Sequence, residues 1–150
     1  MIYLEHCLRR AAVPPPRLVH VLRTSDERWV FPDLRAEVLD LFPQAEVREG
    51  PPDDARASEA DLVIVPLVEA GAFPYQDVAY RALPLLRSLA AGPLARSRAH
   101  VVVYRARWRE ADVVAAASLR RYVRRLAFER RVAAGIGRSS LLRKILAPLH

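Results

Sequence analysis

The sequence contains a single cysteine, Cys7, so no disulfide can form within the chain. Apolar runs are short. A representative one is LVIVPLV at 62–68, well below the roughly 18 apolar residues that a membrane-spanning helix needs. The first sixteen residues, MIYLEHCLRRAAVPPP, hold no apolar segment of the signal-peptide type. We therefore expect a cytoplasmic protein, with contact to a membrane surface as the alternative.

Glycine is missing where the phosphate-binding motifs of nucleotide-binding domains require it. The segment RTSDER (23–28) follows the first predicted strand and contains none, which excludes both a G-x-G-x-x-G motif and a P-loop there. His6 and Cys7 are adjacent, but no second histidine or cysteine close by completes a zinc set. There is also no G-x-S-x-G elbow for a nucleophilic serine. The sequence predicts no metal site and no cofactor.

What the chain does contain is enough apolar sequence for one folded domain. It has 150 residues, of which 52% are hydrophobic. Short runs rich in β-branched residues predict strands, and apolar residues at helical spacing predict helices. The expected strands are 17–24, 44–50, 61–68 and 99–108. The expected helices are 31–42, 73–92 with a kink or a split at Pro84, 110–135 and 139–149.

Strands that alternate with helices predict βαβ units and a parallel sheet. We expect a three-layer α/β domain of Rossmann- or flavodoxin-like type, with about four mainly parallel strands and a basic helical C-terminus. The order 2-1-3-4 and the order 3-2-1-4 both remain open. Residues 1–16 form an N-terminal segment, 17–109 the α/β core, and 110–150 basic helices packed on that core, within one domain overall.

In open α/β sheets, ligands bind beyond the carboxyl ends of the strands. Guanidinium groups there suit a phosphate, an indole suits stacking on a base, and Asp26 or Glu69 suits a general base. The alternative is that these strands simply end in solvent. The residues expected at those ends are Thr24, Ser25, Asp26, Glu69, Gly71, Arg105, Arg107 and Trp108.

The stretch ASEADLVIVPLV (57–68) resembles the EADLF-FVP stretch in the amino-terminal Rossmann-like half of exostosin-type glycosyltransferases of the GT-B class. The resemblance covers about a dozen residues. It implies a domain that handles a nucleotide-sugar or another phosphorylated ligand. Because the chain is too short for two such halves, it also implies a lone acceptor-side domain or a subunit that needs a partner. No catalytic residue of that family can be transferred to this sequence.

Positive charge is concentrated in the last third of the chain. Residues 1–94 contain 10 Arg and 14 acidic residues, a formal charge of −4. Residues 95–150 contain 13 Arg and one Lys against three acidic residues, a formal charge of +11. Such asymmetry suggests an anionic partner. The scarcity of lysine, one against 23 arginines, is equally what a GC-rich genome would produce on an ordinary surface.

The helix predicted over 110–135 separates its residues into two faces at about 100° per residue. One stripe should pack on the sheet: Ala115, Leu119, Tyr122, Val123, Leu126 and Ala133. The opposite face carries Arg120, Arg121, Arg124, Arg125, Phe128 and Arg131. Arg130 falls close to the apolar stripe, which predicts a bend or an end there. An aromatic ring among arginines suits an acidic protein, an anionic membrane or nucleic acid. The alternative is that Phe128 packs against the helix predicted over 139–149 or against a second copy of the chain. Nucleic acid is less favoured, because no recognition motif accompanies the basic face.

Overall fold

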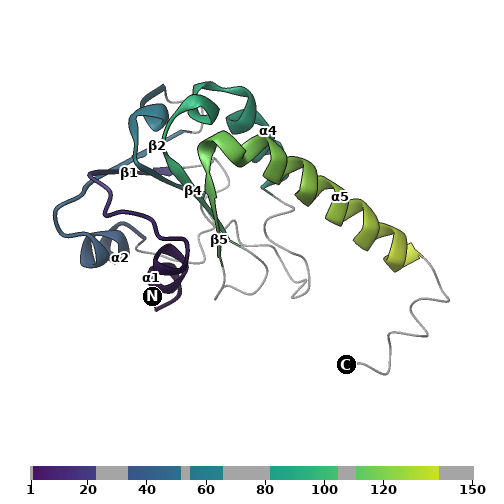
Figure 1. The fold of residues 1–150 in the computed structure, drawn as a ribbon, viewed down its shortest axis with the longest axis horizontal. Coiled ribbons are helices and arrows are strands. Elements are labelled where there is room, and N and C mark those ends of the chain that lie inside the picture. The colour runs from purple at the N-terminus through teal and green to yellow at the C-terminus, as the bar shows by residue number, and fades with distance from the viewer. Residues whose placement is uncertain (1, 23–33, 52–54, 66–81, 105–110, 139–150) are drawn as a thin grey trace.

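A computed structural model of the chain describes residues 2–22, 34–51, 55–65, 82–104 and 111–138. These residues form an α/β domain around a five-stranded sheet of order β2-β1-β3-β4-β5 (Figure 1). The strands are β1 (Leu18–Leu22), β2 (Glu46–Gly50), β3 (Leu62–Val65), β4 (His100–Tyr104) and β5 (Ala111–Ala115). The first four are parallel to one another, and β5 pairs with β4 in the antiparallel sense.

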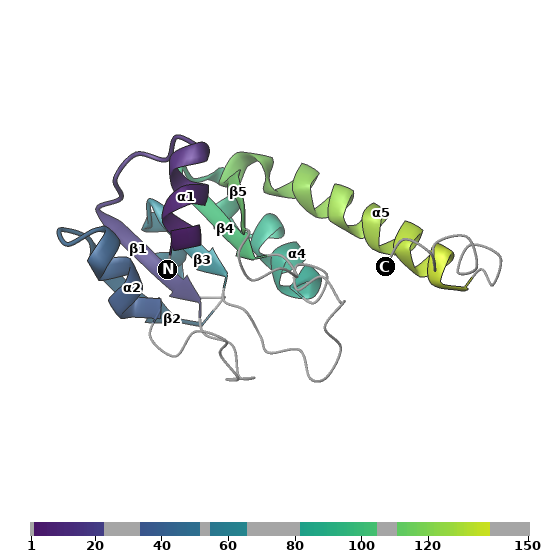
Figure 2. The same ribbon diagram turned by 90° about the horizontal axis from the view of Figure 1, so that it is seen from below.

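Helices cover both faces of this sheet (Figure 2). α1 (Ile2–Arg10) and α2 (Leu34–Leu41) pack on one face, and α4 (Leu83–Ala91) and α5 (Leu119–Arg138) pack on the other. Three short 3-10 helices, Ala55–Glu59, Pro93–Arg96 and Ala116–Ser118, connect the main elements. Side chains alternate along each strand, so Leu62 and Ile64 of β3 join the α1/α2 core, whereas Val63 and Val65 join the α4/α5 core. The described residues therefore form three layers.

Within the described residues, each of the four predicted segments contains a strand, and these four strands are parallel as expected. All four residues of β3 are buried, as expected for a central parallel strand that is covered on both faces. Of the two open strand orders, the structure has 2-1-3-4, extended by β5. The expectation of about four strands was one short.

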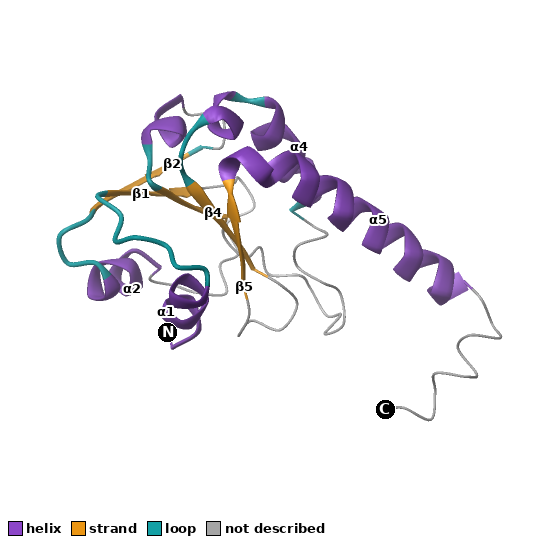
Figure 3. Cartoon of the chain, in the orientation of Figure 1, coloured by secondary structure: helices purple, strands orange, loops and turns teal. Residues whose placement is uncertain are grey.

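The fifth strand corrects the prediction of a helix that begins at residue 110. Residues 111–115 form β5, and α5 begins only at Leu119 (Figure 3). The segment ADVVA contains adjacent β-branched residues, Val113 and Val114, and pairing with β4 satisfies backbone groups that β4 would otherwise leave open. The strong helical periodicity from Leu119 onward masked this short strand. Ala115, assigned to the buried helical stripe, is instead an exposed strand residue.

Two other helix predictions concern Pro84 and Arg130. Pro84 stands in the first turn of α4, where its missing N–H leaves no hydrogen bond unmade; residues 73–81 lie outside the described part, so the predicted kink or split at Pro84 stays a prediction. α5 continues through Arg130 to Arg138 without ending. Its second half projects beyond the sheet (Figure 1), so Arg130 meets solvent rather than the core. The helix predicted over 139–149 lies outside the described residues. Within the described chain, no helix has the length and apolarity to cross a membrane.

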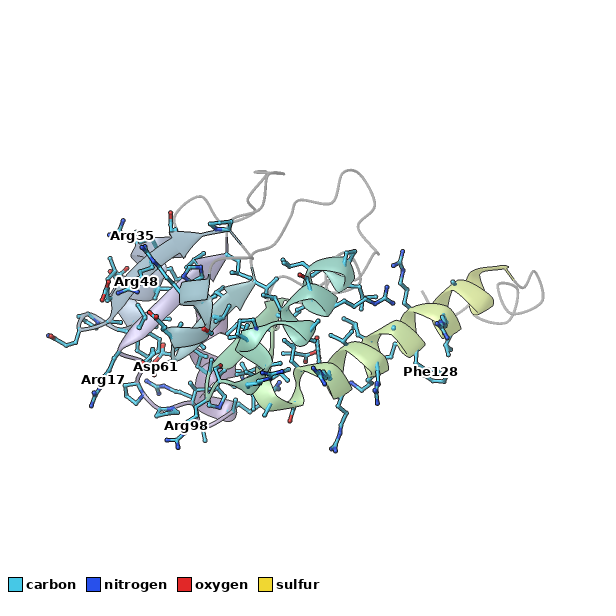
Figure 4. The ribbon with its side chains drawn as sticks, turned by 90° about the horizontal axis from the view of Figure 1, so that it is seen from above. Arg17, Arg35, Arg48, Asp61, Arg98 and Phe128 are labelled. Carbon is cyan, nitrogen blue, oxygen red and sulfur yellow. The ribbon has the colours of Figure 1, made fainter. Side chains whose placement is uncertain are left out.

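Asp61 aligns the amino ends of three adjacent strands. Its Oδ2 accepts hydrogen bonds from the backbone N–H of Arg17 at 2.8 Å and of Leu18 at 3.0 Å (Figure 4). Its own N–H donates to the Leu18 carbonyl, and its carbonyl accepts from the His100 N–H, both at 2.9 Å. Asp61, which precedes β3, therefore links the amino ends of β1, β3 and β4. This edge of the sheet is opposite the edge where a ligand was expected.

Candidate partner-binding surface

The predicted ligand cleft falls at the carboxyl edge of the sheet. β1, β3 and β4 are neighbours and parallel, so their last residues, Leu22, Val65 and Tyr104, share that edge. The direction of strand addition reverses between β1 and β3, which is where open α/β sheets bind ligands. The side chains expected to line the cleft all lie outside the described residues: Thr24, Ser25, Asp26, Glu69, Gly71, Arg105, Arg107 and Trp108.

The outward face of α5 is described, and it agrees with the helical-wheel prediction. Leu119, Tyr122, Val123 and Leu126 are buried against α4 and the sheet. The predicted outer residues are all exposed: Arg120, Arg121, Arg124, Arg125, Phe128 and Arg131. Phe128 is 66% exposed and Val132 is 45% exposed, and they are the exposed large hydrophobic residues among the side chains whose burial the structure describes. Phe128 lies on the part of α5 that projects from the domain (Figure 4).

Two of these arginines are engaged in contacts within the domain. Arg120 Nε donates a 2.9 Å hydrogen bond to the Ala90 carbonyl, one of the last carbonyls of α4, which lack helical partners. Arg125 lies 3.9 Å from Asp112 and 3.5 Å from Glu129, and its guanidinium sits 5.3 Å from the centroid of the Tyr122 ring. Both arginines therefore have partners within the domain.

Arg121, Arg124 and Arg131 differ, because none of them forms a hydrogen bond or ion pair with another described residue. Arg124 and Arg131 join Arg87 of α4 around a groove of about 290 Å³ whose lining includes Phe128. Three arginines thus line the same groove as one exposed aromatic residue. Arg87 was not anticipated from the sequence, because its place in the groove depends on how α4 packs against α5.

A second, larger pocket of about 390 Å³ lies between α1, β5 and the start of α5. Arg10, Arg121 and Arg125 contribute positive charge to its lining, and Asp112 is the one acidic residue there. The remaining lining residues are Cys7, Ala11, Val113, Val114, Ser118 and Tyr122. Sequence reasoning missed this pocket, because Arg10 lies more than a hundred positions from Arg121 and β5 had been assigned to a helix.

The described residues offer binding chemistry rather than a recognisable catalytic set. They contain no group of three or more His, Cys, Asp or Glu side chains placed to hold a metal ion. Their surplus is of guanidinium groups, which bind carboxylates and phosphates through paired N–H donors. No protein-family model, curated protein or solved structure matches this chain. The function is therefore inferred from the chemistry of the surface.

Proposed function

We propose that this protein is an interaction module that binds an acidic protein through the outward face of α5. The observation that carries the proposal is Phe128, which is 66% exposed on a projecting helix between Arg124 and Arg131, two cations without a partner among the described residues. Exposing an aromatic ring is unfavourable, and aromatic residues and arginine are the residue types enriched at protein interfaces.

The same surface fits a membrane less well. A helix that lies in a bilayer interface needs a continuous apolar face, and among the side chains whose burial the structure describes, the exposed large hydrophobic residues are Phe128 and Val132. Nucleic acid is also less favoured, because one aromatic ring gives no stacking series, and Glu129 places a carboxylate on the same helix. An acidic protein with an apolar residue among its carboxylates matches both the arginines and the ring.

The test is fluorescence anisotropy with a labelled acidic peptide, EELEELEELEE, titrated with the whole chain. Replacing Arg124→Ala together with Arg131→Ala should weaken binding about tenfold, or about 1.4 kcal/mol. The matched control is Arg35→Ala with Arg98→Ala, which removes the same charge from exposed sites far from Phe128 (Figure 4). Control and test variants that bind equally weakly would show only a general charge effect and would contradict the proposal. A short DNA duplex or phosphatidylserine vesicles binding more tightly than the peptide would contradict it too.

A second candidate is favoured by the strand order. A β2-β1-β3-β4 arrangement places a switch point beside β1 and β3. There a flavodoxin- or Rossmann-like domain, glycosyltransferase-like as the resemblance implies, would hold a nucleotide-sugar or another phosphorylated ligand. Arg105 and Arg107 would bind phosphate with Thr24, Ser25 and Gly71, Trp108 would stack, and Glu69 or Asp26 would act as base.

Thermal unfolding of the chain against nucleotides, nucleotide-sugars and inorganic phosphate tests this second candidate. A saturable rise in Tm with one nucleotide, lost in Arg105→Ala with Arg107→Ala but kept in Arg124→Ala with Arg131→Ala, would support the cleft. If no compound in the panel changes the Tm, the second candidate function is wrong.

A further inference from the structure

β5 is the last strand of the described sheet, and the direction of its backbone groups follows from two hydrogen bonds. The His100 N–H donates to Asp61, so it points toward β3, and the next residue, Val101, must turn toward β5. The Ala116 N–H donates to the Ala99 carbonyl. Ala99 therefore faces β5, which gives the same alternation along β4, with Ala99, Val101 and Val103 directed toward β5. In the observed register, Val101 and Val103 face Val114 and Asp112 as hydrogen-bonded pairs.

Val113 therefore directs both its N–H and its C=O away from the sheet. It lines the 390 Å³ pocket between α1 and α5, and it forms no hydrogen bond with another described residue through these groups. An edge strand in this state is a template for one further strand. The pocket supplies the space beside that edge.

The two edges of the sheet are protected differently. At the β2 edge, three of five residues are charged, Glu46, Arg48 and Glu49, and such charges discourage pairing with another chain. β5 has a single charged residue, Asp112, and that carboxylate is already engaged by Tyr122 and Arg125. β5 also lacks proline and a bulge. As far as the described residues show, the β5 edge is thus open to pairing where the β2 edge is protected by charge.

Charge decides what the β5 edge would accept. Arg10 stands on the α1 side and Arg121 on the α5 side of the pocket, and neither forms an ion pair with another described residue. Successive side chains of an added strand point to opposite faces. Two adjacent carboxylates on that strand would therefore reach Arg10 and Arg121 from opposite faces. A second copy of this chain fits poorly, because pairing two β5 edges would bring the arginines of both copies together.

We propose that the β5 edge binds an extended acidic segment as a sixth, added strand, with the backbone of Val113 supplying hydrogen bonds and Arg10 and Arg121 binding adjacent carboxylates. This inference rests on the proposed acidic partner and specifies how part of it is held. The pocket is continuous with the proposed surface, since Arg121 and Arg125 of α5 line it. Main-chain pairing supplies affinity in this mode of recognition, and side-chain contacts supply selectivity.

The probe is a labelled strand-forming peptide, TEEVEEVT, measured by fluorescence anisotropy with the whole chain. Arg10→Ala with Arg121→Ala should weaken its binding at least tenfold. Arg9→Ala with Arg130→Ala is the matched control, because it removes the same charge from exposed positions of the same two helices outside the pocket, and it should have little effect. Equal Tm values and circular dichroism spectra establish that all the variants are folded.

Backbone methylation of the peptide separates strand addition from charge attraction. A peptide methylated at alternate nitrogens keeps every carboxylate but cannot donate along one edge, so two such peptides, one for each edge, are compared. One of them should bind at least tenfold more weakly than TEEVEEVT, and the other should bind as TEEVEEVT does. Equal affinities for all three peptides would overturn the inference.

Three further results would also overturn strand addition. Inorganic phosphate that displaces TEEVEEVT at equal concentration would make the pocket a small-anion site. A concentration-dependent dimer that competes with the peptide would make β5 a contact between copies. Loss of TEEVEEVT binding in Arg124→Ala with Arg131→Ala, but not in the Arg10 and Arg121 variant, would move the contact to the α5 face and leave the proposed function standing. The proposed function itself fails separately, if EELEELEELEE binding is indifferent to Arg124 and Arg131.

Discussion

The phenolic oxygen of Tyr122 donates a hydrogen bond of 2.8 Å to Asp112 Oδ2 and so joins α5 to the edge strand β5. Arg125 lies 3.9 Å from the same oxygen and over the Tyr122 ring. This network fixes the first turns of α5 against the sheet, while the second half of the helix projects. It also leaves Arg10 and Arg121 as the cations of the neighbouring pocket that have no partner in the described chain.

Tyr122→Phe should lower the free energy of unfolding by about 1 kcal/mol, since it removes one hydrogen bond and keeps the buried ring. Urea denaturation measures the change. The effect should vanish in an Asp112→Ala background, because the partner is then missing. An equal loss in both backgrounds would show that the hydrogen bond does not stabilise the fold.

Truncation of two neighbouring residues of α5, Leu126 and Phe128, should change stability by very different amounts. Leu126 is fully buried, so Leu126→Ala should lower the free energy of unfolding by about 2–5 kcal/mol. Phe128→Ala should change it by less than about 0.5 kcal/mol, because the ring is mostly in solvent. Thermal or urea unfolding of the isolated chain distinguishes them. A large loss of unfolding free energy in Phe128→Ala would mean that the ring packs against the domain and is not available to a partner.

Ala12 has a positive φ of 52°, the left-handed conformation that favours glycine. It follows α1 in a Schellman arrangement, with the Ala12 N–H donating to Arg9 and the Val13 N–H donating to Leu8. Ala12→Gly should therefore raise the free energy of unfolding by about 1 kcal/mol. Ala11→Gly, at a residue without positive φ, should lower it instead. A Tm that falls for both variants would refute this account of the cap.

Asp61→Ala should lower the free energy of unfolding by about 1–3 kcal/mol, because two backbone N–H groups lose a charged acceptor. Glu59→Ala is the matched control, since its ion pair with Arg48 at 3.7 Å is exposed and contributes at most about 1 kcal/mol. Chemical denaturation of both variants gives the comparison. Similar small losses would mean that water replaces the Asp61 carboxylate at no cost.

The sequence predicted β1, β3 and β4 because their apolar, β-branched runs indicate burial on both faces, as in β3. β2 has no such run, because it is an edge strand with three charged residues. The sequence predicted the outer face of α5 because helical periodicity survives wherever one stripe packs. The sequence did not predict β5, because a five-residue edge strand next to a long periodic helix has little hydrophobic periodicity of its own. The sequence did not predict the pocket beside Val113, because α1 and α5 are far apart in the chain and come together only in the folded structure. The ligand residues expected near Glu69 and Arg105 remain a prediction.

The proposed function requires that Phe128 and its neighbouring arginines bind an acidic protein. The most direct measurement is the affinity of EELEELEELEE for the wild-type chain and for Phe128→Ala, each at a series of salt concentrations. The account predicts that Phe128→Ala weakens binding about tenfold at every salt concentration while the salt dependence stays unchanged, since the ring contributes apolar contact and the arginines contribute charge. Unchanged affinity in Phe128→Ala, with binding abolished by salt alone, would reduce α5 to a diffuse basic surface and contradict the proposal.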